Sequence, residues 1–450
     1  MRMRVNAGVV ACVLVGACVP SRAELFGPVH EAAAKRFGVE VEWRERVQPS
    51  AAAEARVAEL LAKPLTAESA VAIALLNSAE LQAEYEQLGV AGAQVARAHA
   101  PPNPAGEARM VLPASGDAHV ELTLVESVTG LVTMLPRHHA ADAQLRAARR
   151  HALVATVLAA ARARVAFFGA VAATQRLELR ARIAEAAATS AELALRLHTA
   201  GNLTDLDLAR EQVFAEEAGL AERDAEAALV AARGRVDAAL GLSGAQAAGW
   251  KTATRLAGAP DAPPALDRFV AEATDASLDL DELTWRLRAA GYDVQVARWH
   301  SFLPDLGLGV AANHDGAWGF GPAATISVPI FDWGQGERAA AWSSVRRLRQ
   351  QHAALAVRVA AVARAARARL LAAHERATRL RTHVLPLREK ILDEAVKQYN
   401  AMNLGPFELL VIRREHIEAE LQYIDALADY WSAGADVDAL RAGALPEGSR

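Results

Sequence analysis

The chain has 450 residues and a formal net charge of -4, and 52% of its residues are hydrophobic although only 5% are aromatic. Much of the apolar share is alanine, which favours helices and lets them pack closely. The charge balance gives no indication of nucleic-acid binding, and an arginine-rich run over residues 346–369 is most simply explained as a solvated helix face.

The N-terminus has the pattern of an export signal. Two arginines precede an apolar run over residues 7–17 that is too short to cross a bilayer, so residues 1–17 are predicted to be a signal peptide. The run ends in small residues before Cys18, which resembles the lipobox of bacterial lipoproteins; cleavage after Ala23 is the alternative. We expect lipidation at Cys18, because Cys12 would leave with the signal and no other thiol would enter an oxidising periplasm.

An internal repeat sets the domain organisation. Residues 197–210 align with residues 398–411, and this offset is too long for a solenoid unit, so we predict two structural halves. The predicted segments are a lipidated N-terminal arm over 18–64, a first repeat over 65–242, a linker over 243–264, a second repeat over 265–442 and a tail over 443–450.

Each half is predicted to contain a helix, a β-hairpin, a long helix and a closing helix. In the first half these are a helix over 66–100, strands near 105–112 and 119–128, a long helix over 140–197 and, after a break at Gly201, a helix to residue 240. In the second half they are a helix over 265–301, strands near 304–312 and 323–331, a long helix over 336–401 kinked at Pro386, and a final helix from Gly405 to residue 441. Helices of such length imply a coiled coil.

The four predicted strands alternate apolar residues with polar or very small ones. A soluble sheet packed on helices would alternate in the same way, but two features favour a membrane location. The strands approach the roughly nine to eleven residues that cross a bilayer at a tilt, and aromatic residues bracket the second hairpin as interfacial girdles do. These residues are Trp299, Phe302, Phe331 and Trp333 at its base and Trp318 and Phe320 at its tip.

Spanning strands must close into a barrel, because an open sheet edge cannot face lipid. Four strands are too few to close alone, since known barrels start at about eight. The chain must therefore oligomerise if it spans the membrane, and a dimer would supply about eight strands and a trimer about twelve.

Residues 328–338, which read Val-Pro-Ile-Phe-Asp-Trp-Gly-Gln-Gly-Glu-Arg, resemble the strand-to-helix junction of the TolC-like outer-membrane efflux proteins. The segments around Tyr399 and Phe407, and around His198 and Asp207, resemble that family's turns between paired helices. The resemblance covers roughly residues 66–442. It implies a mainly α chain with a membrane β-barrel part, assembled as a homotrimer with a twelve-stranded barrel and an α-helical periplasmic tunnel.

The resemblance also implies a function. The chain would be the outer-membrane exit channel of a Gram-negative tripartite efflux system, and it would conduct substrates passively from a periplasmic adaptor and an inner-membrane pump to the exterior. It would be anchored by lipid in the outer membrane and extend into the periplasm. Two alternatives remain open: a periplasmic adaptor, and a pore-free coiled-coil envelope lipoprotein.

The resemblance assigns site residues to three places. The barrel–tunnel junction takes Pro329, Phe331, Asp332 and Gly334, and the helix turns take Gly201 and Gly405. The periplasmic aperture takes Glu408, and Asp207 is matched to Glu408 through the repeat alone. The alternative for both acids is an exposed helix-start position favoured by the helix dipole.

The chain departs from the family pattern at three positions. Met402 stands where glycine is usual, Val411 stands where an aperture acid often occurs, and the first-half junction around Pro136 lacks the Ile-Phe-Asp character. The departures concern the gate and the first barrel–tunnel turn.

The sequence contains no motif for catalysis, a cofactor or a metal. His-Glu-x-x-His, Cys-x-x-Cys, phosphate-cradling glycine loops and Gly-x-Ser-x-Gly are all missing. His138 and His139 could contact a metal on a tunnel wall, but adjacent residues point apart on a helix, so a solvated helix start is favoured. We therefore expect no enzyme activity, no cofactor and no metal site.

Overall fold

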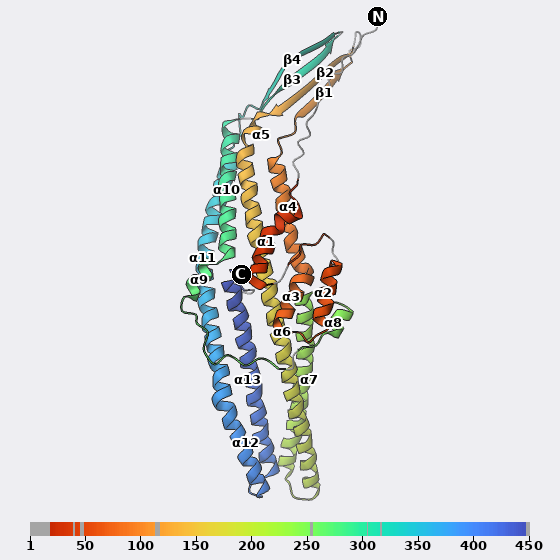
Figure 1. The fold of residues 1–450 in the computed structure, drawn as a ribbon, viewed down its shortest axis with the longest axis vertical. Helices are drawn as coiled ribbons and strands as arrows, with labels where there is room; N and C mark the ends of the chain where they lie inside the picture. The colour runs from red at the N-terminus through yellow and green to blue at the C-terminus, as the bar shows by residue number, and fades with distance from the viewer. Residues whose placement is uncertain are drawn as a thin grey trace. The chain divides into compact units, whose positions relative to one another are not determined.

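The computed structural model describes residues 19–38, 41–45, 49–112, 118–252, 255–303, 305–315 and 317–446. The predicted signal peptide, Cys18 and the turn expected at 113–117 lie outside these residues. The chain forms two compact units, each built from three separate stretches of sequence (Figure 1). Unit 1 takes residues 1–28, 86–150 and 281–353, and unit 2 takes residues 29–85, 151–280 and 354–450.

Unit 1 holds the four described strands in one antiparallel sheet with the order β1-β2-β3-β4. The strands are β1 (Ala105–Val111), β2 (His119–Ser127), β3 (Leu306–Asp315) and β4 (Ala317–Ile326). Because β2 pairs with β3, the hairpins of the two sequence halves form a single surface. β1 and β4 are the outer strands, and each has one edge without a partner among the described residues.

Helices adjoin the base of the sheet. The short α5 (Val128–Val132) follows β2, and its Thr129 hydroxyl accepts a hydrogen bond from the Leu306 N–H at 3.2 Å where β3 begins. The other helices of unit 1 are the adjoining parts of α1 (Arg22–Phe37), α4 (Ala79–His99), α6 (Met134–Thr199), α10 (Leu278–Phe302) and α11 (Gln335–Arg379). α10 and α11 pack together through Ala290, Val294 and Val345.

The last strand differs from its prediction. It was expected near 323–331, but β4 runs from Ala317 to Ile326, so Trp318 and Phe320 lie within the strand. Two glycines and Pro322 hide the alternation in this part of the sequence. Beyond Ile326, Pro329 has no N–H to donate to a neighbouring strand, and the chain leaves the sheet.

Unit 2 is a bundle of helices. Its own helices are α2 (Ala51–Leu61), α3 (Ala67–Asn77), α7 (Asp205–Leu240), α8 (Ala245–Gly249), α9 (Phe269–Asp275), α12 (Leu385–Asn400) and α13 (Pro406–Arg441), joined by parts of α1, α4, α6, α10 and α11. Its core combines many alanines with a few large side chains, of which Trp250, Tyr85 and Phe269 are fully buried. The Tyr85 hydroxyl contacts the Thr156 hydroxyl at 2.8 Å, and burial raises the pKa of Tyr85.

The helix expected over 66–100 is interrupted, and the interruption connects the two ends of the first repeat. The Ser78 hydroxyl accepts a hydrogen bond from the Leu81 N–H at 3.2 Å, which starts α4 as a separate helix. The Asn77 side-chain amide donates to the carbonyls of Leu240 and Gly241 at 3.1 and 2.7 Å. The end of α3 is therefore tied to the end of α7.

The long helices follow the expected plan. α6 has 66 residues, which corresponds to about 100 Å of helix, and α7 ends at Gly241 with a left-handed φ of 68°. Among the described helices, α6 has an 18-residue window apolar enough to cross a bilayer by length and composition. Because 61% of that window is buried inside the protein, it reads as a core segment.

Candidate functional site

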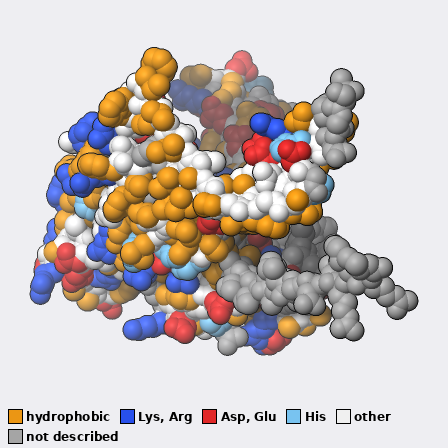
Figure 2. Space-filling model, turned by 90° about the horizontal axis from the view of Figure 1, so that it is seen from above, with side chains coloured by type: hydrophobic (Ala, Val, Ile, Leu, Met, Phe, Trp, Pro, Cys, Tyr) orange, Lys and Arg blue, Asp and Glu red, His pale blue; other side chains and the backbone are white. Residues whose placement is uncertain are grey.

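The sheet of unit 1 has two chemically different faces. On one face, Leu122 lies opposite Ala108 of β1 and Ala312 of β3, and Ala312 lies opposite Phe320 of β4. The larger exposed apolar side chains on this face are 42–81% exposed, and they are Met110, Leu122, Leu124, Leu308, Val310, Trp318, Phe320 and Ile326. Figure 2, a view onto the sheet end, shows hydrophobic side chains gathered over a broad area. An apolar face this open is typical of a surface that contacts lipid or protein.

The opposite face of the sheet is polar on one hairpin and mainly glycine and alanine on the other. The first hairpin contributes Glu107, Arg109, Glu121 and Thr123 to this face. The second contributes Gly307, Gly309, Gly319 and Gly321, together with the polar side chains of Asn313, Asp315 and Thr325. A Cβ at Gly309 would lie 1.8 Å from the Leu124 carbonyl oxygen, so no larger residue fits there without a backbone shift. The two faces have the alternation of a barrel wall, with one side for lipid and one for water.

The junction after β4 is built around Gly334. This residue has a left-handed φ of 68°, and a Cβ on it would lie 2.5 Å from the Ser301 hydroxyl, so both the backbone conformation and the available space favour glycine. The Asp332 carboxylate accepts the Gly334 N–H at 2.9 Å and shapes the turn before α11. Phe331 is 91% exposed, and Pro329 precedes it in the connection outside any strand or helix.

The first-half junction separates its two histidines. The His138 ring stacks on His99 with centroids 4.1 Å apart, and the His139 ring stacks on Tyr292 at 5.1 Å. The adjacent side chains therefore point in different directions. Among the described residues, no group of three or more His, Cys, Asp or Glu side chains is placed to hold a metal ion.

The turns between paired helices share one backbone geometry in the two halves of unit 2. In the α6–α7 turn, the Asn202 N–H donates to the Leu197 carbonyl at 2.9 Å and the Gly201 N–H donates to the His198 carbonyl at 2.8 Å. In the α12–α13 turn, Asn403 bonds Gln398 and Met402 bonds Tyr399 in the same pattern, both at 2.9 Å. Both are Schellman motifs, so the repeat seen in the sequence extends to individual hydrogen bonds.

The residue at the left-handed position differs between the turns. Gly201 has a φ of 76°, and its counterpart Met402 has a φ of 61° and is 94% exposed. Met402 is the only non-glycine residue with positive φ in the described part of the chain. Gly405, predicted to open the final helix, has extended backbone and stands at the N-cap of α13, where Thr204 stands in the first half.

The two predicted aperture acids have different surroundings. Asp207 belongs to an N-terminal capping motif, since the Thr204 hydroxyl donates to its carboxylate at 2.7 Å and Arg210 approaches it at 3.4 Å. Glu408 is exposed and has no hydrogen bond or ion pair with any described residue. The Asp207 charge is thus locally balanced, and the Glu408 charge is open to solvent.

The two helix hairpins of unit 2 lie alongside each other near their turns. The Arg414 guanidinium of α13 sits over the Phe214 ring of α7 at 4.8 Å, and Arg388 of α12 pairs with Glu415 of α13. Phe214 lies about two helical turns after Asp207, and Arg414 lies slightly less than two after Glu408. Figure 1 shows the two hairpin turns at the same end of the bundle. The fold thereby brings the two acids to one end of unit 2.

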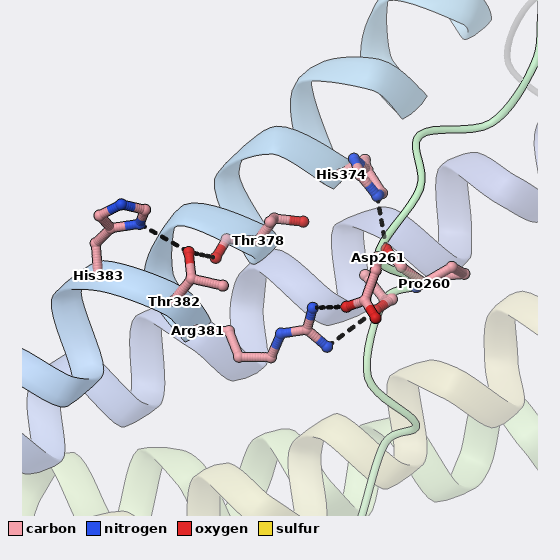
Figure 3. Close-up of polar contacts among 8 residues, drawn as sticks. Pro260, Asp261, His374, Thr378, Arg381, Thr382 and His383 are labelled. Carbon is pink, nitrogen blue, oxygen red and sulfur yellow. Dashed lines mark hydrogen bonds and ion pairs between the residues drawn. The ribbon is translucent and has the colours of Figure 1, made fainter.

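The linker between the repeats contacts an irregular turn of helix, of which the sequence predicted the kink at Pro386 but not the π-helical form. A π-helical turn, Leu380–Val384, separates α11 from α12, and the Leu385 N–H bonds the Leu380 carbonyl five residues earlier. Pro386 lies directly after this turn, so the kink predicted at Pro386 takes the form of a π-helical turn, which is wider than an α-helical one. As Figure 3 shows, Arg381 in this turn pairs with Asp261 of the linker, and His374 contacts the Pro260 carbonyl at 2.8 Å.

Comparisons with known proteins agree with this architecture. No protein-family model matches the chain. The cobalt-zinc-cadmium resistance protein CzcC of Cupriavidus metallidurans is 25% identical over 390 residues, which cover 84% of this chain and 90% of CzcC. The Campylobacter jejuni CmeC outer membrane channel has a TM-score of 0.69 at 14% identity and covers 85% of this chain and 86% of its own. The open state of the Neisseria gonorrhoeae MtrE outer membrane channel has a TM-score of 0.62 at 16% identity, over 85% and 90%.

These likenesses confirm the predicted fold class and the resemblance to the TolC-like outer-membrane efflux proteins. The chain has the fold of an outer-membrane channel protomer, with long helices and a four-stranded antiparallel sheet.

The first prediction concerns the two faces of the sheet. Val310→Arg should weaken assembly in lipid by about 2–4 kcal/mol, because Val310 lies midway along β3 on the apolar face, and Leu308→Arg nearer the strand end should cost less. The neighbouring Ala311→Arg, on the opposite face, serves as control. Folding titrations in vesicles measure the difference, and equal losses for Val310→Arg and Ala311→Arg would show that neither face contacts lipid.

The second prediction concerns the left-handed turn residues. Met402→Gly should raise the free energy of unfolding by about 1 kcal/mol, because a residue with a Cβ is strained at positive φ. Gly201→Ala in the equivalent turn should lower it by a similar amount. Denaturant unfolding of the detergent-solubilised protein measures both, and a destabilised Met402→Gly variant would mean that the methionine side chain makes a contact worth more than the strain.

Proposed function

We propose that this chain is the outer-membrane exit channel of a tripartite efflux system, through which substrates pass passively from the periplasmic side to the exterior. The observation that carries the proposal is the sheet of unit 1, which has one exposed apolar face, one polar or bare face and two unpaired edges. The fold of outer-membrane channels supports it, as does the relative CzcC, whose name describes cobalt, zinc and cadmium resistance.

A homotrimer is the assembly that best pairs the two open edges of the sheet. The two outer edges, those of β1 and β4, cannot remain open in lipid. Pairing β4 of one copy with β1 of the next would give three copies a barrel of about twelve strands, enough for a water-filled interior. A periplasmic adaptor and an inner-membrane pump would be the partners at the helical end.

The sheet favours a channel over the two alternative functions, an adaptor and a pore-free lipoprotein. A pore-free coiled-coil lipoprotein has no need for four strands with an apolar face open to solvent, and an adaptor has no need for the same helix hairpin twice. No enzyme activity is proposed, because transport through a barrel and tunnel requires none. The CzcC relationship makes divalent transition-metal cations the first substrates to test.

Lipidation of Cys18 is a separate part of the proposal. Its support is the small-residue pattern before the cysteine. A diacylglyceryl group would tie the mature N-terminus to the membrane without spanning it. Mass spectrometry of the mature protein should find a lipid-modified Cys18 at the N-terminus, and an unmodified start at Glu24 would refute this part while leaving the channel intact.

The gate is proposed to depend on Glu408. Three copies of a carboxylate at a narrow mouth would attract cations and repel one another. In reconstituted trimers, Glu408→Gln should lower the preference for cations and weaken block by divalent cations, because the charge in the constriction is lost. Single-channel recordings under asymmetric salt measure both quantities.

Asp207→Asn is the matched control for the gate. Its carboxylate is already engaged by Thr204 and Arg210, so removal of its charge should alter conduction much less than Glu408→Gln does. Unchanged selectivity and block in Glu408→Gln would exclude that residue from the constriction. A wild-type protein that forms no conducting trimer would overturn the channel function itself.

A further inference from the structure

The last two turns of α10 present an exposed amphipathic stripe. Gln295, Arg298, Trp299 and Phe302 share one side of the helix, as their spacing requires, and they line a surface groove of about 470 Å³. Trp299 is 43% exposed and Phe302 is 76% exposed. The buried face of the same helix, with Val294 and Ala297, points elsewhere, so the groove residues are not part of the core of unit 1.

The connection from β4 to α11 continues this apolar surface. Its large side chains are 62–91% exposed, and they are Val328, Ile330, Phe331 and Trp333. The end of α10 and the start of α11 are neighbours, because His300 and Glu337 approach to 3.5 Å and Gly334 packs against Ser301. We call Trp299, Phe302, Ile330, Phe331 and Trp333 the collar. It adjoins Ile326, the last residue of β4, and thus the lipid-facing side of the sheet.

Arg298 is an unpaired cation beside the collar. It is exposed and has no hydrogen bond, ion pair or ring contact with any described residue. The acids of the neighbouring segment are occupied, since Glu337 approaches His300 and Asp332 accepts the Gly334 N–H. Several other arginines of unit 1 are engaged, and Arg150, for example, pairs with Asp281 at 2.6 Å.

The chemistry of the stripe changes along the helix axis. Phe302 and Trp299 lie nearest the sheet, and Arg298 and Gln295 follow on the side away from it. Aromatic rings prefer the boundary between hydrocarbon and headgroups, and a guanidinium just beyond them matches the depth and the bidentate geometry of a lipid phosphate.

We propose that the α10 groove binds the headgroup of a phospholipid in the periplasmic leaflet of the outer membrane, with Arg298 on the phosphate, Gln295 as a second donor and the collar against the glycerol and first methylene groups. This rests on the proposed function, because it requires the sheet to span that membrane. The single unpaired positive charge makes the site prefer anionic lipids over zwitterionic ones. The lipid would hold the tunnel helices at a fixed depth relative to the barrel.

The first experiment measures lipid retention by the full-length trimer. The protein is exchanged from vesicles of phosphatidylcholine mixed with phosphatidylglycerol into detergent, and bound lipids are counted by native mass spectrometry. Arg298→Gln should lower retained phosphatidylglycerol about fivefold, the equivalent of about 1 kcal/mol for one surface cation. The control is Arg347→Gln, an exposed arginine of α11 that also lacks a described partner. Equal retention in the two variants would overturn the assignment of Arg298.

The second experiment measures depth through tryptophan quenching. Phospholipids brominated near the carbonyl end of the acyl chain should quench Trp299, so Trp299→Phe should reduce the quenchable part of the emission. Trp285→Phe is the matched control, because Trp285 lies 14 residues earlier on nearly the same side of α10, about 21 Å from Trp299 along the axis. No difference between the variants would mean that the groove is covered by a neighbouring copy of the chain, which would refute lipid binding there.

The two proposals can fail independently. Arg298→Gln should keep the trimer and its conductance, because the residue lies outside the pore and the helix turns. A conducting trimer that shows neither lipid preference nor quenching of Trp299 would refute the headgroup site alone. A protein that retains lipid but forms no pore would refute the proposed function.

Discussion

The requirement that no backbone hydrogen-bonding group be left open to hydrocarbon governs this structure. The sheet of unit 1 satisfies that requirement internally between its four strands but not at its two edges. One chain alone therefore cannot close a barrel in a membrane. Its exposed apolar face is explained by contact with lipid and not by poor packing. The pairing of β2 with β3 is the central step, since it merges the hairpins of both repeats into one surface and leaves a single edge at each side for a neighbouring copy.

The two halves of the chain are similar in backbone and different in chemistry. Both helix turns use the same pair of hydrogen bonds, yet glycine occupies the left-handed position in one and methionine in the other. Asp207 and Glu408 align, yet one is held in a capping motif and the other is unpaired. Among the described residues, the π-helical turn occurs in the second half alone, where Arg381 contacts the linker through Asp261.

Sequence patterns were most informative where one physical rule acted alone. Apolar periodicity located α6 except for its first turns, which begin at Met134 and include Pro136, and Gly405 with Pro406 located the start of α13. The predicted bounds of β1 and β2 are correct to within a residue at either end. The pattern was least informative in β4, because Gly319, Gly321 and Pro322 carry no strand signal, although the pairing with β3 keeps them in the sheet. The break at Ser78 was also missed, since its cause is a hydrogen bond to Leu81 together with the contact of Asn77 with α7. For the site, the repeat was enough to match Asp207 with Glu408. The two acids differ in their surroundings because Thr204 and Arg210 contact the Asp207 carboxylate. Sequence spacing alone does not show these contacts.

The glycines of β3 and β4 have a consequence for how such a conduit would handle its cargo. On that hairpin the face opposite the apolar one carries glycine or alanine at most positions, and its polar side chains are those of Asn313, Asp315 and Thr325. The first hairpin brings Glu107, Arg109, Glu121 and Thr123 to the same face, so contacts with a passing solute would be mainly electrostatic and shared by many compounds. Chemically unrelated compounds would travel at rates set by their size and charge. Discrimination would then have to take place upstream, and the barrel could serve a changed repertoire of cargo without any change in its own sequence.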